Sequence, residues 1–87
     1  MGLSVAEFLR GIPALAGSDG WRREGNLVVL AHPRGEIRIR LQPREPRRLA
    51  SLEVPVTRVE FDLSSLDAQA RQHFMQRFDL HYRRGGG

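Results

Sequence analysis

The chain has 87 residues, 40% hydrophobic and 28% charged, with a formal net charge of +4, which fits one small domain with a single core. Cysteine and lysine are absent. Their absence excludes disulfides, thiolate zinc ligands, a cysteine nucleophile, a Schiff-base lysine and a P-loop lysine. The absence of cysteine favours a cytoplasmic protein. No stretch approaches the roughly 20 apolar residues of a membrane span, so we expect no membrane partner.

The first predicted element is a helix that begins at about Val5. Ser4 and Glu7 form an S-x-x-E capping box, in which each residue satisfies a free backbone N–H of the other. Gly11 is predicted to end this helix in a left-handed cap. Pro13, which cannot continue a hydrogen-bonded helix, is predicted to start a separate short turn.

Residues 21–42 are predicted to form three successive strands, because their apolar residues recur with period two. The strands are "WRR", "NLVVLA" and "EIRIRLQ", and "HPRG" between the last two is typical of a type I turn in a hairpin. The segment "LVVLA" is apolar on both faces, so we expect a cover on each side, either the N-terminal helix or a second copy of the protein. Trp21 is predicted to lie in the core, with an exposed interaction residue as the alternative.

The following segment is predicted to contain a loop and two more short strands. The stretch "PREPRR" is interrupted by prolines, which indicates a loop. Beyond it, apolar residues keep one parity over 52–56 and the other over 59–63. A change of parity requires a turn or a bulge, so Pro55 is predicted to separate strands at about 48–54 and 57–63.

A long amphipathic helix is predicted over residues 66–82. Its apolar side chains recur every four residues, as expected for one buried face. They are Leu66, Ala70, Phe74, Phe78 and Tyr82. Ser64 or Ser65 is predicted to cap the helix, and His81, which falls on the apolar face, is predicted to be partly buried and hydrogen-bonded.

The expected fold class is therefore α+β, with a single domain over 1–84 and a flexible glycine tail over 85–87. An antiparallel sheet of four or five strands packs against a short N-terminal and a long C-terminal helix. The sequence contains no G-x-S-x-G, no nucleotide-binding fingerprint and no H-x-x-x-H pair. We therefore expect no enzymatic activity, no metal and no cofactor.

The candidate binding site is an arginine-rich stretch over 34–48, whose charge surplus equals the whole net charge of the chain. Its arginines are Arg34, Arg38, Arg40, Arg44, Arg47 and Arg48. Such a surface attracts an acidic protein or a nucleic acid, although charged residues on a sheet also serve as plain solvated surface. The sequence predicts a non-enzymatic binding or assembly protein, with a structural homodimer as an alternative.

The C-terminal "HYRRGGG" resembles the ends of ubiquitin-like modifiers and small sulfur-carrier proteins. Arg83, Arg84, Gly86 and Gly87 occupy the matching positions, and the resemblance implies adenylation of the Gly87 carboxylate. Those folds begin with a β-hairpin and carry the tail after a strand, whereas here a helix precedes it. A helix C-terminus with basic residues near its dipole and a glycine cap is the alternative.

Overall fold

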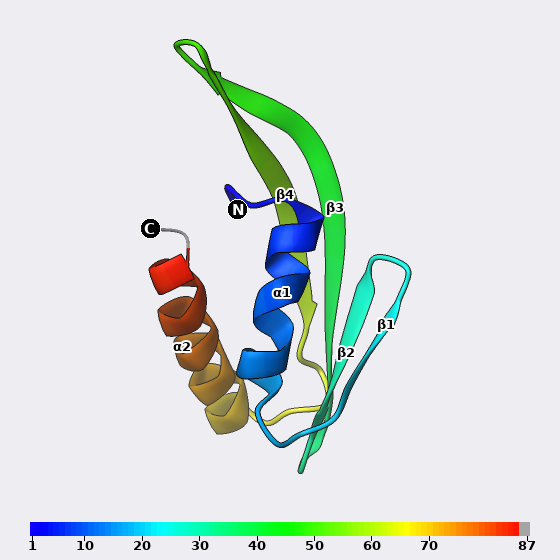
Figure 1. The fold of residues 1–87 in the computed structure, drawn as a ribbon. Helices are drawn as coiled ribbons and strands as arrows, with labels where there is room; N and C mark the ends of the chain where they lie inside the picture. Colours follow the sequence, from blue (N-terminus) through cyan, green and yellow to red (C-terminus); the bar gives the residue numbers. More distant parts are fainter. Residues whose placement is uncertain (86–87) are drawn as a thin grey trace.

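Two helices lie side by side on one face of a four-stranded antiparallel sheet in the computed structural model, which describes residues 1–85 (Figure 1). The elements are α1 (Val5–Ala16), β1 (Trp21–Glu24), β2 (Leu27–His32), β3 (Gly35–Leu49), β4 (Leu52–Asp62) and α2 (Ala68–Gly85). The strand order β1-β2-β3-β4 follows the chain. The predicted α+β class is confirmed, and the prediction of a fifth strand is wrong.

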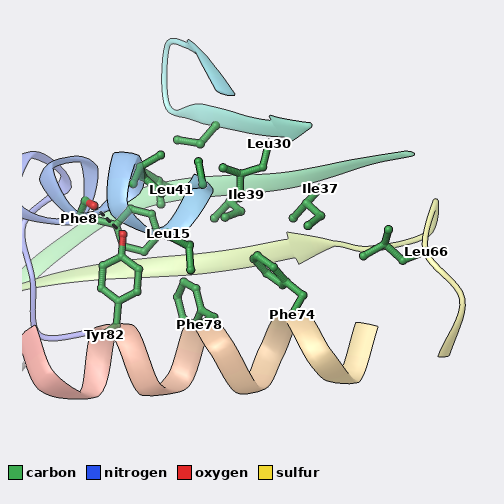
Figure 2. Packing of buried hydrophobic residues seen from close by; sticks show 13 residues of the cluster. Phe8, Leu15, Leu30, Ile37, Ile39, Leu41, Leu66, Phe74, Phe78 and Tyr82 are labelled. Carbon is green, nitrogen blue, oxygen red and sulfur yellow. Dashed lines mark hydrogen bonds between the residues drawn. The ribbon is translucent and has the colours of Figure 1, made fainter. Parts of the chain in front are cut away.

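The hydrophobic core lies between the two helices and the inner face of the sheet (Figure 2). The sheet contributes buried aliphatic residues, namely Val28, Leu30, Ile37, Ile39 and Leu41. Of the predicted apolar face of the C-terminal helix, Leu66, Phe74, Phe78 and Tyr82 are buried and Ala70 is half-buried against them. This face is confirmed, although α2 begins and ends later than the predicted range.

The capping box at the start of α1 is confirmed, but the predicted end of the helix is wrong. Helix α1 continues through Gly11 and Pro13, and Gly17, with φ of 63°, forms its C-cap. A Cβ at Gly11 would lie 3.0 Å from Tyr82 Oη and 3.1 Å from His81 Nε2. Glycine is therefore needed here for the close approach of α2 and not for a left-handed turn.

Helix α2 is capped by Asp67 and not by either predicted serine. The N–H of Ala70 donates a hydrogen bond of 2.8 Å to Asp67 Oδ1. The N–H and the hydroxyl of Ser64 instead donate to Asp62 Oδ1, at 3.0 and 2.6 Å. These bonds hold the pKa of the Asp62 carboxyl below its usual range.

The hairpin predicted at "HPRG" is confirmed, since β2 and β3 pair from His32↔Gly35 onward. Gly35 has φ of 147°, and a Cβ at this position would lie 2.6 Å from Ser65 Cβ. Both the backbone angle and the close approach of the loop that leads to α2 therefore require glycine here.

Strands β3 and β4 extend well beyond the helices as a two-stranded arm, which we define as residues 43–56 (Figure 1). The predictions of a loop at "PREPRR" and of two strands separated at Pro55 are therefore wrong. The pairing shows a register shift between Arg44 and Arg47, where β3 holds one residue more than β4. Pro46 lies within this bulge, a place in a sheet where proline is tolerated.

The other two prolines of the arm are compatible with strands because their nitrogens face open edges. Leu41 donates its N–H to Asn26 O, so Pro43, two residues later, also directs its nitrogen toward the β2 side. Within residues 1–85, no strand lies beside Pro43, because β2 pairs no further than Leu27↔Arg40. Pro55 likewise shares the outer edge of β4 with the N–H of Thr57, so neither proline removes a bond between β3 and β4.

Candidate functional site

The apolar residues of β4 lie on two opposite faces of the sheet. Val59 and Phe61 pack against the core beneath the helices. Side chains alternate along a continuous strand, so residues of even number, including Val54 and Val56, lie on the outer face. The change of parity in the sequence thus means that the apolar side chains of β4 change from one face of the sheet to the other. Those of the arm are directed away from the core.

The arm carries a strip of apolar side chains on this outer face, which we call the arm strip. Its members are Leu49, Leu52, Val54 and Val56, where Leu49 stands opposite Leu52 in register. Leu49 is 53% and Leu52 is 67% exposed, while both valines are half-buried. Scattered exposed leucines are ordinary, but a contiguous exposed strip is typical of an interaction site.

Two of the predicted arginines stand directly opposite members of the arm strip on the outer face. Arg47 stands opposite Val54, and Arg44 stands opposite Val56. Within residues 1–85, neither guanidinium forms an ion pair within 4.0 Å of a carboxylate. The arm strip is therefore bordered by two arginines that are available to a partner.

The remaining predicted arginines lie near carboxylates from other parts of the chain, which the fold brings beside them. On the outer face, the register sets Arg38 opposite Asp62 and Arg40 opposite Glu60. Arg48 pairs with Glu53 at 3.6 Å. Arg34 pairs with Asp67 at 3.5 Å. The local charge surplus of residues 34–48 is therefore largely cancelled, because β4 and the start of α2 supply acidic neighbours.

The outer face below the arm is a lattice of basic and acidic side chains in equal number. It consists of Arg22, Glu24, Glu36, Arg38, Arg40, Arg58, Glu60 and Asp62. Its ion pairs join Arg22 to Glu36 at 3.2 Å and Arg58 to Glu60 at 3.1 Å. The hydrogen bond to Glu36 is the main reason that the pKa of Arg22 is raised. These side chains are exposed, so we treat the lattice as solvated surface.

The central residue of the second apolar face of "LVVLA" is covered within one chain. Val29 lies on the outer face between Arg22 and Arg38 in register, and it is only 2% exposed. The long aliphatic parts of arginine side chains commonly cover apolar surface in this way. The apolar residue Val29 on this face can thus be explained without a homodimer.

A polar cavity of about 330 Å³ lies between the β2–β3 turn and the first turns of α2. His32 and His73, which are distant in sequence, both line it beside Arg34 and Arg77. His32 Nδ1 accepts a hydrogen bond of 3.0 Å from the N–H of Arg34. In the described part of the chain, no group of three or more His, Asp or Glu side chains could hold a metal ion.

Several other predicted residues lie away from the arm. His81 is half-buried and its Nε2–H donates to Gly11 O at 2.8 Å, so this prediction is confirmed. Trp21 is 39% exposed on β1, so its predicted core position is wrong. Arg83 and Arg84 fall within α2, whereas Gly86 and Gly87 of the proposed carrier tail lie outside the described residues.

Comparison with protein-family models, curated proteins and solved structures finds no match for this chain. Across residues 1–85, no helix has the length and apolarity to span a membrane. The candidate site therefore rests on the geometry of the arm. The sequence contains one signal for it, the change of parity between residues 52–56 and 59–63, which by itself predicts a break in the strand.

Proposed function

We propose that this chain is a non-enzymatic binding or assembly protein that engages an acidic protein through the arm strip, with Arg44 and Arg47 at its border. A single observation carries the proposal: continuous β4 sets Leu52, Val54 and Val56 on the face opposite the core. Leu49 and Leu52 are largely exposed and lie near arginines that form no ion pair within residues 1–85. This arrangement is typical of an interface core with its polar rim.

A protein partner fits the arm better than a nucleic acid does. The outer face below the arm carries basic and acidic side chains in equal number, so it offers little net attraction to phosphates. The arm also contains Glu45 and Glu53, which would repel phosphates, and no aromatic residue on which a base could stack. A protein surface with an apolar patch and acidic rim instead complements the arm strip and its two arginines.

The two exposed leucines of the arm strip can contribute part of the free energy of binding. Burying one leucine side chain contributes about 1.5 to 3 kcal/mol. Leu49 and Leu52 retain more than half of their surface for such burial. Because the contact area of a single arm is small, we expect a moderate affinity that depends on a few residues at the tip.

Site-specific photo-crosslinking tests this proposal. A photoreactive amino acid at Leu52 is expected to crosslink one acidic protein in cells, whereas the same group at Leu80 is not. Leu80 is a matched control because it is 63% exposed, close to the 67% of Leu52, but lies on α2. The purified partner should then bind the wild-type chain and lose about tenfold in affinity with Leu52→Ser.

Nucleic acid is the competing outcome. Titration with short RNA and DNA at two salt concentrations should leave the NMR signals of the arm unchanged. Binding that perturbs Arg44 and Arg47 and weakens steeply with salt would contradict a protein partner. Equal crosslinking from Leu52 and Leu80 would contradict the assignment of the site to the arm.

A further inference from the structure

We infer that the partner binds the outer face of the arm, and that the partner does so with an apolar groove bordered by carboxylates. The edges of the arm do not accept an added strand. This inference rests on the proposed function and specifies its mode of binding. A two-stranded arm has two open edges, and open edges ordinarily recruit another strand through their free N–H and C=O groups. A partner could therefore contact the arm along its edges or on one of its faces.

The edge of β4 is closed by proline and by the N-terminus. Residues of odd number direct their N–H groups to this edge, as the bond from Thr57 N–H to Met1 O at 2.9 Å shows. The amino group of Met1 also donates to Thr57 O at 2.7 Å, so the N-terminal residue occupies the edge at this point. Two residues toward the tip, Pro55 has no N–H to offer.

The edge of β3 is closed in the same way. Leu41 donates its N–H to Asn26 O at 2.7 Å, and this is the last bond from β3 toward the β2 side before the arm. At the next position on that edge, Pro43 lacks an N–H, and Pro46 follows in the bulge. An incoming strand would need regularly spaced donors along either edge, and the prolines interrupt that spacing.

With both edges interrupted by proline, the outer face is the surface of the arm that is available to a partner. It presents Leu49 and Leu52 at the tip, Val54 further in, and Arg44 and Arg47 beside them. The opposite face near the tip is charged, because Arg48 stands opposite Glu53 there and the two form an ion pair. One face is thus apolar with a positive border, which fits an apolar groove with carboxylates at its rim.

Strand addition can be tested with a peptide that copies residues 52–62 and carries threonine in place of Pro55. Threonine restores the missing N–H, so every residue of the probe can donate a backbone hydrogen bond. We expect it to bind the wild-type chain more weakly than about 1 mM, and to bind the Pro55→Thr variant at least about tenfold more tightly. Circular dichroism establishes that the variant keeps its fold. Tight binding to the wild-type chain, or no gain in the variant, would overturn the claim that proline closes the edge.

Docking on the face can be tested with 8-anilinonaphthalene-1-sulfonate, an apolar ring system that carries one anionic group. In NMR titrations we expect it to shift the methyl signals of Leu49, Leu52 and Val54. The Leu52→Ser variant should weaken this binding about fivefold, and Leu80→Ser should leave it unchanged. Shifts centred on α2, or an unchanged affinity in Leu52→Ser, would overturn the assignment of the face.

These tests use the purified chain alone, so their outcome is separate from that of the crosslinking experiment. If crosslinking finds no partner while both tests give the expected result, the proposed function fails and the description of the arm stands. If a partner is found whose affinity rises in the Pro55→Thr variant, the chain is a binding protein but the inferred mode is wrong.

Discussion

The hydroxyl of Tyr82 donates a hydrogen bond of 2.7 Å to the carbonyl oxygen of Phe8, and the two rings stack with their centroids 4.6 Å apart (Figure 2). Next to this pair, His81 bonds to Gly11 O. Both contacts join the last turns of α2 to the middle of α1. They fix the helix pair against the sheet from which the arm extends.

The Tyr82→Phe variant should lose about 1 kcal/mol of unfolding free energy, because it keeps the stacked ring and removes one buried hydrogen bond. Urea denaturation measures this loss. Phe8 and its ring contacts remain, so a loss above about 3 kcal/mol would show that the hydroxyl holds more of the structure than this single bond.

The stability of the wild-type chain should fall at alkaline pH through the same residue. Burial raises the pKa of the Tyr82 hydroxyl above its ordinary value of 10.0. The unfolded chain therefore releases this proton first, so the contribution is complete below about pH 10 and is lost above it by at most about 1.4 kcal/mol per pH unit. Urea titrations between pH 8 and 11 should show a weaker decline in Tyr82→Phe, and parallel curves would contradict this account.

The Gly11→Ala variant tests the close approach of the helices. Alanine favours a helix by about 1 kcal/mol, but its Cβ would crowd Tyr82 and His81. We expect a net loss of about 1 to 2 kcal/mol in thermal unfolding. Gly20→Ala is the matched control, because a Cβ there meets nothing within 4 Å. Equal stability of both variants would contradict a packing role for Gly11.

Local signals in the sequence were sufficient for several elements of the fold. The capping box at Ser4, the turn before Gly35 and the apolar face of α2 each depend on neighbours within a few residues. The continuation of α1 past Gly11 was not visible, because it depends on contacts with residues 70 positions further along the chain. A glycine can be required for an unusual backbone angle or for the close packing of a neighbouring helix, and the sequence alone does not distinguish the two roles.

The arm shows the same limit for proline. The sequence predicts breaks at Pro43 and Pro55, because a proline in the middle of a sheet removes a ladder bond. Which edge a residue faces depends on the pairing register, which the sequence does not contain. The cancellation of the arginine charges has the same origin, since Asp62 and Glu60 reach Arg38 and Arg40 only through that register.

The Ala50→Gly variant should stabilise the arm. Ala50 has φ of 55° in the turn between β3 and β4, a left-handed conformation that costs a residue with a Cβ about 1 kcal/mol. Glycine adopts it freely, so amide hydrogen exchange near the tip should slow about two- to fivefold. Ser51→Gly is the control, since its φ is not positive, and the two variants should differ.

The Thr57→Val variant should loosen the N-terminal segment. Thr57 is fully buried, and its hydroxyl donates a hydrogen bond of 2.6 Å to Leu3 O. Valine has a similar shape, so the expected loss of about 1 to 2 kcal/mol reports the missing bond. Hydrogen exchange should rise at Leu3 and its neighbours, and unchanged exchange together with unchanged stability would contradict this role.

The most direct test of the central claim is the affinity of the crosslinked partner for Leu52→Ser and Leu80→Ser, measured side by side by calorimetry. Both leucines are largely exposed and neither belongs to the core, so both variants should fold as the wild type does. We predict that Leu52→Ser binds about tenfold more weakly, and that Leu80→Ser binds as the wild type does. Equal affinity of the two variants would contradict the claim that this chain binds through its arm.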